Sequence, residues 1–177
     1  QNITEESKEV IYAYGMELLI SDVLNTIIVL LIALFSHTLP AVVVFIAVFM
    51  GLRQFVGGFH ANSHLSCMFT LVMVMMVFSY GICNVSGHIT PIFSISFIMI
   101  ALPIILCIAP VPHPNKPMSE EKSVKLRKRS CILAVTLSVV TIALLVFQYQ
   151  KLSLYVSSGM LLSAIMALLG HFLNRGD

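Results

Sequence analysis

The 177-residue chain is far more apolar than a water-soluble domain, with 58% hydrophobic residues, 10% charged residues and a mean hydropathy of +0.98. Together with a formal net charge of only +2, this excludes the ordinary soluble classes and predicts an all-α integral membrane protein whose surroundings are a lipid bilayer. We expect no nucleic-acid partner.

The N-terminal segment favours a helix that lies on the membrane surface. Charged residues at 5, 6, 8 and 9 precede apolar and aromatic residues at 10–14, which suits an interfacial amphipathic helix at about residues 3–15. No cleavable signal peptide is evident, and we expect one membrane domain over residues 1–177.

About six apolar runs follow, each close to the roughly 20 residues that cross the hydrocarbon core as a helix. Turn-forming residues separate these runs. The expected spans are about 17–35, 40–55, 67–83, 91–108, 130–147 and 152–173.

The second run is short and ends at Gly57-Gly58. This pair suggests a broken or re-entrant backbone, which is tolerated at membrane depth only where protein or a watery cavity satisfies its polar groups. Such cavities can host chemistry.

A thiol and two imidazoles follow this glycine pair. His60, His64 and Cys67 have the i, i+4, i+7 spacing that puts side chains on one face of a helix. Because a cysteine becomes a reactive thiolate near neutral pH only beside a base or cation, either histidine could activate Cys67. The alternative is that Cys67 packs as a small apolar residue and the histidines lie at the membrane interface.

A metal site is a weaker interpretation of the same residues. His60, His64 and Cys67 are plausible zinc ligands that Glu17 or Asp22 could complete, but the segment lacks the HExxH glutamate of a zinc protease. We therefore expect no metal and no cofactor. Since carboxylates are expensive in a span, Glu17 and Asp22 could instead orient an imidazole, pair with a cation or lie at the interface.

The other cysteines, Cys83, Cys107 and Cys131, stand alone at span ends and are expected only to pack. Gly159 and Ser163 fit a small-xxx-small contact in the last run. This contact could support a homodimer, although such pairs more often pack helices within one chain.

The cations predict the orientation, because short loops rich in Lys and Arg stay cytoplasmic. With both termini in the cytoplasm, only Lys151 falls outside, and the Cys67 segment lies at the inner face. The cations on the cytoplasmic side are Lys8, Arg53, Lys116, Lys122, Lys125, Arg127, Lys128, Arg129 and Arg175. The basic run at 116–129 anchors a span against anionic headgroups, and the same cations could hold an acidic peptide tail.

The chain resembles the accessory gene regulator B (AgrB) family through three motifs. These are Tyr14-Gly15-x-Glu17, then Arg53-x-x-x-Gly57-Gly58-x-His60-Ala61-x-x-x-x-x-Cys67, and about fifty residues later Ala109-Pro110-Val111-x-x-x-Asn115-Lys116-Pro117 with its basic run. The resemblance implies an integral-membrane cysteine endopeptidase of bacterial quorum sensing that processes an AgrD-type propeptide. It implies that Cys67 is the nucleophile and His60 the general base, and that Arg53, Gly58 and Lys116 support activity. His64 is not part of the family pattern.

Two other functions fit the residues without the resemblance. A transporter or channel would line a proton or metal pathway with His60, His64 and Asp22. A structural membrane subunit would use its polar residues only to join helices.

Overall fold

The computed structural model describes part of the chain, and every structural statement below concerns that part. It comprises residues 16, 20, 23–57, 64–111 and 120–173, without the side chains of residues 64–68, 120, 122 and 173. The interfacial helix expected at about 3–15 lies outside it, as do Glu17 and Asp22.

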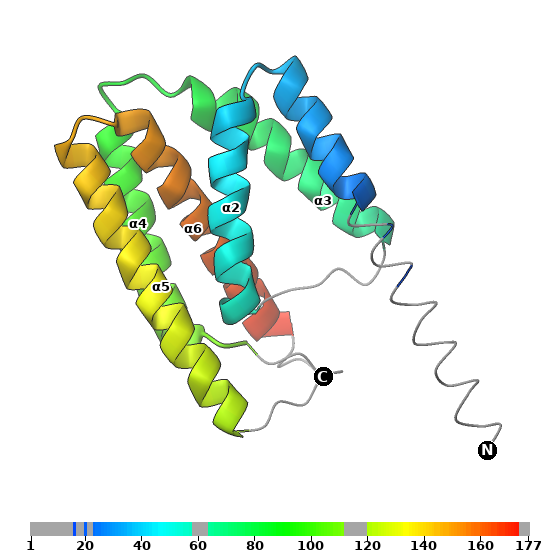
Figure 1. Ribbon diagram of the computed structural model, residues 1–177, viewed down its shortest axis with the longest axis vertical. Helices are drawn as coiled ribbons and strands as arrows, with labels where there is room; N and C mark the ends of the chain where they lie inside the picture. Colours follow the sequence, from blue (N-terminus) through cyan, green and yellow to red (C-terminus); the bar gives the residue numbers. More distant parts are fainter. Residues whose placement is uncertain (1–15, 17–19, 21–22, 58–63, 112–119, 174–177) are drawn as a thin grey trace.

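Within the described residues the regular elements are helices, as Figure 1 shows. The all-α membrane fold predicted from composition is confirmed. The helices are Val23–Phe35, α2 (Leu39–Val56), α3 (His64–Met76), α4 (Thr90–Ile108), α5 (Glu120–Val146) and α6 (Gln150–Leu173).

Four of these helices are long and apolar enough to cross a membrane, namely α2, α4, α6 and the Ser123–Val146 part of α5. Two shorter apolar helices, Val23–Phe35 and Phe69–Asn84, occupy the regions of the first and third expected spans. The limits of the six spans in the bilayer stay predictions.

Local sequence explains several of the helix ends. Pro40 and Pro91 stand in the first turns of α2 and α4, where a missing N–H costs no intrahelical hydrogen bond. Gly57 follows the last residue of α2 with a φ of 73°, a left-handed conformation that glycine adopts without strain. The tight turns before α2 and α6 likewise contain positive φ values, at His37 and Gln148.

The helix that begins with α3 changes its winding before it ends. It continues as a π-helix, η1 (Val77–Gly81), and then as a 3-10 helix, η2 (Ile82–Asn84). The amide nitrogen Nδ2 of Asn84 donates to the carbonyl oxygen of Tyr80 at 2.9 Å, which helps to satisfy the backbone where the winding changes.

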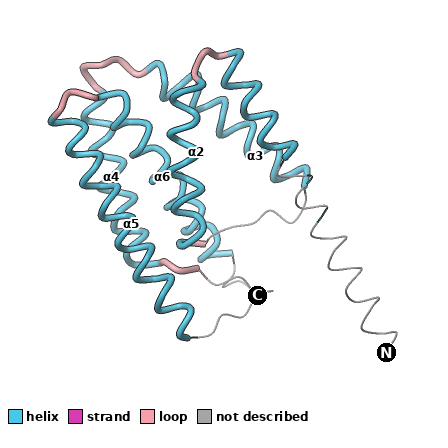
Figure 2. Tube along the Cα trace, viewed as in Figure 1, coloured by secondary structure: helices cyan, strands magenta, loops and turns pink. Residues whose placement is uncertain are grey.

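The helices alternate in direction between two ends of the molecule. The short loops at 36–38, 85–89 and 147–149 lie at the upper end in Figure 2, whereas Gly57 and the loop at 109–111 lie at the lower end. Consequently α2, α4 and α6 all run downward, and α3 and α5 run upward.

Helix α6 is the centre of the fold. It contacts α2, α4 and α5, and 56% of its apolar span is buried inside the chain, against 33% or less for the other three spans. One core joins these four helices, and its buried residues are Leu52, Val56, Ala101, Ile105, Ala109, Val111, Ala134, Met160, Ala164 and Ala167.

A second core joins the Val23–Phe35 helix and the α3–η1 helix to the upper half of α2. The ring of Phe78 stacks on Phe45 with centroids 4.2 Å apart and meets Tyr155 edge-on at 5.9 Å. The hydroxyl of Thr38 donates to Ser79 Oγ at 3.2 Å beside this core.

The small-residue pair in α6 packs inside the chain. A Cβ added to Gly159 would lie 2.9 Å from the carbonyl oxygen of Phe45 and 3.1 Å from Val48 Cβ, so the backbones of α2 and α6 approach closely here. One turn further, Ser163 Oγ donates to the carbonyl oxygen of Phe49 at 3.4 Å. The pair that could have supported a homodimer therefore serves a contact within one chain, and the dimer itself stays a prediction.

Candidate functional site

Two of the segments that carry predicted site residues begin at the lower end of the molecule, directly after Gly57 and Val111. Cys67 is the fourth residue of the described part of α3, and its side chain lies outside the described residues. Gly58, His60 and Lys116 also lie outside them. What the structure describes is the framework from which these segments depart.

Arg53 is the predicted site residue whose side chain is described. It lies in the last turn of α2 and is half-buried, with the carbon of its guanidinium 5.5 Å from the centre of the Phe49 ring. This distance allows a cation–π attraction between the guanidinium and the ring. The Arg53 carbonyl accepts the N–H of Gly57 at 3.0 Å, which closes the last turn.

The ends of α2 and α4 are joined by backbone pairing. Gly57 and Val111 form an isolated parallel β-bridge, and the N–H of Val111 donates to the carbonyl oxygen of Val56 at 2.9 Å. Val56 and Val111 are both buried in the core of α2, α4, α5 and α6. The bridge is therefore fixed to this core.

The bridge brings the starts of two motif segments to one point. The segment that carries Gly58 and His60 begins directly after Gly57, and the segment that carries Lys116 begins directly after Val111. His60 is three residues beyond Gly57, and Lys116 is five residues beyond Val111.

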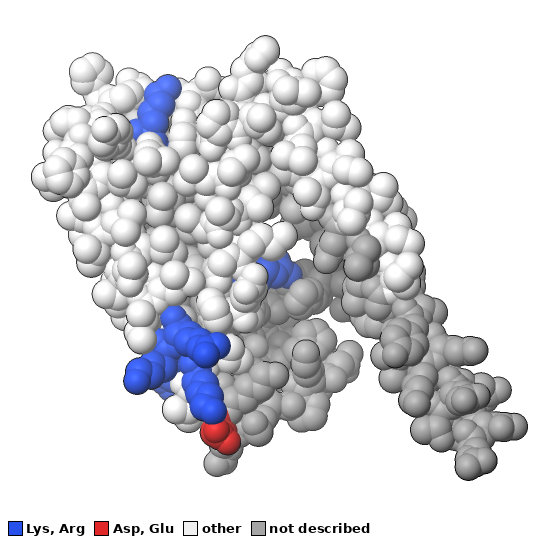
Figure 3. All heavy atoms as spheres, viewed as in Figure 1, with Lys and Arg blue, Asp and Glu red and all other residues white. Residues whose placement is uncertain are grey.

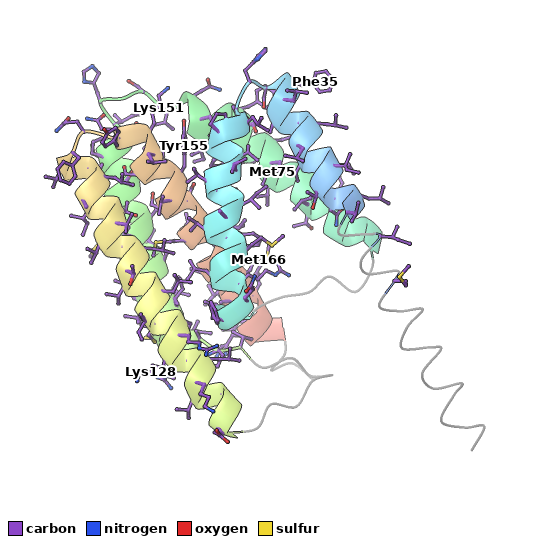
Figure 4. All side chains as sticks on the ribbon, viewed as in Figure 1. Phe35, Met75, Lys128, Lys151, Tyr155 and Met166 are labelled. Carbon is purple, nitrogen blue, oxygen red and sulfur yellow. The ribbon has the colours of Figure 1, made fainter. Side chains whose placement is uncertain are left out.

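Basic side chains gather at the same end. Lys125, Arg127, Lys128 and Arg129 are all exposed in the first turns of α5, and Figure 3 shows a cluster of Lys and Arg at the lower end, below a mostly uncharged surface. Lys125 also pairs with Glu121 at 2.6 Å, an exposed contact worth little in stability. Lys151 lies at the opposite end from Lys128, as Figure 4 shows.

An apolar groove of about 280 Å³ lies away from this end, between η1, α4 and α6. Its walls include Phe45, Val77 and Phe97, and Ser158 is the one polar residue among those that line it. A lining of this kind offers neither a nucleophile with a base nor a charged group, so the groove is not the candidate site.

The metal interpretation stays open to test. Among the described residues, no group of three or more His, Cys, Asp or Glu side chains could hold a metal ion. However, Glu17, Asp22, His60 and the side chains of His64 and Cys67 all lie outside those residues.

Comparison with known proteins gives a match to one family, Accessory gene regulator B (AgrB), over residues 1–167. The chain belongs to the AgrB family. Membership supports a role in the accessory gene regulator system. The match includes all the candidate residues, from Glu17 to Lys116.

A curated relative points the same way. A protein of Clostridium beijerinckii described as AgrB-like is 24% identical over 116 residues, which cover 64% of this chain and 56% of the relative. The chain thus matches little more than half the length of this relative. No solved structure matches the chain.

Sequence reasoning missed the pairing of Gly57 with Val111. Both residues stood in the motifs that resemble AgrB, but only Gly57 carried a local signal, as one of two adjacent glycines between apolar runs. Val111 is an apolar residue between two prolines and shows no chemistry of its own. The pairing uses backbone atoms, which every residue possesses.

Proposed function

We propose that this AgrB-family chain is a membrane cysteine endopeptidase that cleaves an AgrD-type propeptide and promotes its cyclisation to a quorum-sensing peptide. Cys67 is the nucleophile and His60 is the general base. The observation that carries the proposal is the Gly57–Val111 bridge, because it starts the His60 and Lys116 segments at one point near Arg53.

The first half of the reaction exchanges an amide for a thioester. The Cys67 thiolate attacks the carbonyl carbon at the junction between the future signal and the C-terminal tail of the propeptide. The bond from that carbon to nitrogen breaks, and the protonated His60 gives its proton to the departing amine. The tail leaves, and the remaining peptide stays bound to Cys67 as an acyl-enzyme.

The second half releases the enzyme. A cysteine thiol within the bound peptide loses its proton to His60 and attacks the thioester carbon, while Cys67 departs as a thiolate. The product is a thiolactone ring, and a serine in the same place would give a lactone. Exclusion of water by the surrounding membrane protects the acyl-enzyme from hydrolysis until the ring closes.

The first half of the reaction is uphill in free energy and proceeds only if its products are removed. A thioester is less stable than the amide that it replaces, so cleavage is reversible and runs uphill. Destruction of the released tail or removal of the cyclic peptide draws the reaction forward.

We infer that the site faces the cytoplasm and that acidic groups of the propeptide tail bind nearby cations. Lys125, Arg127, Lys128 and Arg129 are exposed at the lower end, which also carries Arg53. A carboxylate forms charge-assisted hydrogen bonds with such groups. An amphipathic propeptide segment would dock on the inner leaflet beside them.

Conversion of a co-expressed AgrD-type propeptide tests the proposal. Cys67→Ala and His60→Ala are each expected to leave the propeptide uncut, while the amount of chain in the membrane stays unchanged. Cys107→Ala and His171→Ala are the matched controls, and both are expected to retain cleavage. Mass spectrometry of the propeptide and of its Cys67 adduct provides the measurement.

Retained cleavage in Cys67→Ala would reject the proposal. Loss of cleavage in His64→Ala but not in His60→Ala would change the base and keep the reaction. A transporter or channel would alter proton or metal flux and give no cut peptide.

A further inference from the structure

We propose that Gly57 is a positioning residue: its pairing with Val111 fixes the direction in which the His60 segment leaves α2. The inference rests on the proposed function, because the direction matters only if His60 must meet Cys67. It adds to the AgrB motif a physical role for a glycine that bears no reactive group.

Two features of Gly57 require glycine. Its φ of 73° lies in the left-handed region, which is strained for residues that carry a Cβ. A Cβ built at this position would also lie only 2.7 Å from the carbonyl oxygen of Val111. At Gly51, two turns earlier in α2, such an atom would meet no other described segment within 4 Å. The requirement for glycine therefore arises from the bridge at Gly57 and does not apply at Gly51.

The partner of Gly57 has little freedom to move aside. Val111 is 5% exposed, Ala109 is 3% exposed and Val56 is fully buried, and all three belong to the same core. The hydrogen bond from the Val111 N–H to the Val56 carbonyl oxygen also resists separation of the two paired segments. A side chain at position 57 would therefore be accommodated mainly by rotation of Gly57 itself.

Such a rotation would act directly on the next residues. His60 is three positions beyond Gly57, so a change in the backbone angles at Gly57 redirects the whole segment that leads to the imidazole. A misplacement of about 1 Å in a catalytic group can cost about 100-fold in rate. Through the bridge, the packing between α2 and α4 thus determines the position of the His60 imidazole.

The experiment compares Gly57→Ala with Gly51→Ala. Both variants are made in a chain in which Cys83, Cys107 and Cys131 are replaced by serine, so that Cys67 is the remaining thiol. Two quantities are measured in proteoliposomes: kcat and KM for cleavage of an AgrD-type propeptide, and the rate at which iodoacetamide alkylates Cys67 as a function of pH.

Gly57→Ala is expected to lower kcat by about 100-fold with a much smaller change in KM. Its alkylation profile is expected to shift to that of His60→Ala, because the thiol has lost its base. Gly51→Ala should match the parent chain in both measurements. A merely structural role would reduce the amount of folded protein and leave the profile of the folded fraction unchanged.

A second pair of variants keeps the test decisive if Gly57→Ala does not fold. Val111→Pro removes the N–H that donates to Val56, whereas Val111→Ala keeps it. Val111→Pro is expected to show the same shifted profile, and Val111→Ala the parental one. Parental kcat and profile in Val111→Pro, or in a folded Gly57→Ala, would overturn the positioning role.

The failure of this inference is distinct from the failure of the proposed function. If Gly57→Ala behaves as the parent while Cys67→Ala and His60→Ala are inactive, only the positioning role is wrong. If Cys67→Ala still cleaves, the proposed function is wrong.

Discussion

The contact with the Phe49 ring restricts the position of the Arg53 guanidinium. Its guanidinium lies over the ring of Phe49, one turn earlier on α2, and Phe49 is itself buried among the helices. An arginine held in this way loses less rotamer freedom when it binds a carboxylate. The pair therefore holds the Arg53 guanidinium beside Phe49, one turn before Gly57 begins the next segment.

Replacement of the ring tests this contact. Phe49→Leu is expected to lower kcat/KM for propeptide cleavage by about 2- to 30-fold, because a cation–π contact contributes about 0.5–2 kcal/mol. Leucine fills a similar apolar space, so the loss of packing should be small. Phe93→Leu on α4, where the ring pairs with Phe97, is the control and should not affect cleavage. Equal kcat/KM in Phe49→Leu and the parent would remove the role of the ring.

At the scale of helices, the contact between α2 and α6 depends on Gly159. Gly159→Ala would place a Cβ 2.9 Å from a backbone oxygen, which cannot rotate away as a side chain can. We expect this change to destabilise the protein by about 1–3 kcal/mol. The midpoint of thermal unfolding in detergent should then fall by about 2–4 °C for each kcal/mol.

Gly51→Ala is the matched control for this prediction. Among the described residues, no atom outside the adjoining backbone of α2 lies within 4 Å of the added Cβ, and alanine favours a helix more than glycine does. Its unfolding midpoint should stay unchanged or rise. Equal midpoints for Gly159→Ala and Gly51→Ala would contradict the close approach of α2 and α6.

The helical class could be predicted from the sequence, but the pairing of the helices could not. Long apolar runs divided by Gly, Pro and Asn determine that helices form and roughly where turns occur. The contact of Gly159 with Phe45 joins residues more than a hundred positions apart, and nothing in the local pattern around either residue identifies the other. The π-helix η1 is likewise not signalled by its residues.

The candidate site, too, could be predicted only in part from the sequence. Reactive residue types at helical spacing indicated Cys67 with either His60 or His64, and the resemblance to AgrB selected His60 and added Arg53, Gly58 and Lys116. Neither source identified the bridge that joins the two motif segments, because it consists of main-chain atoms of Val56, Gly57 and Val111. The roles of these residues, which are Arg53, Gly58, His60, Cys67 and Lys116, stay predictions.

At the scale of the whole molecule, the separation of charges predicts how the chain sits in a membrane. Lys151 and Lys128 lie at opposite ends, as Figure 4 shows. In a background without other cysteines, Lys151→Cys should react with an impermeant maleimide added to intact cells. Lys128→Cys should react only after the membrane is opened. The reverse pattern would invert the orientation and remove the cytoplasmic site.

The bridge also has a consequence for synthesis of the protein. Its two partners, Gly57 and Val111, stand some fifty residues apart, so the ribosome must complete α3 and α4 after α2 before they can meet. At about 5–20 residues per second, this takes several seconds of translation. During that interval the nascent chain already contains His60 and Cys67 but not the residue that pairs with Gly57. The bridge can thus form only after Val23–Phe35, α2, α3 and α4 have all been synthesised, and it can do so before α5 and α6 exist.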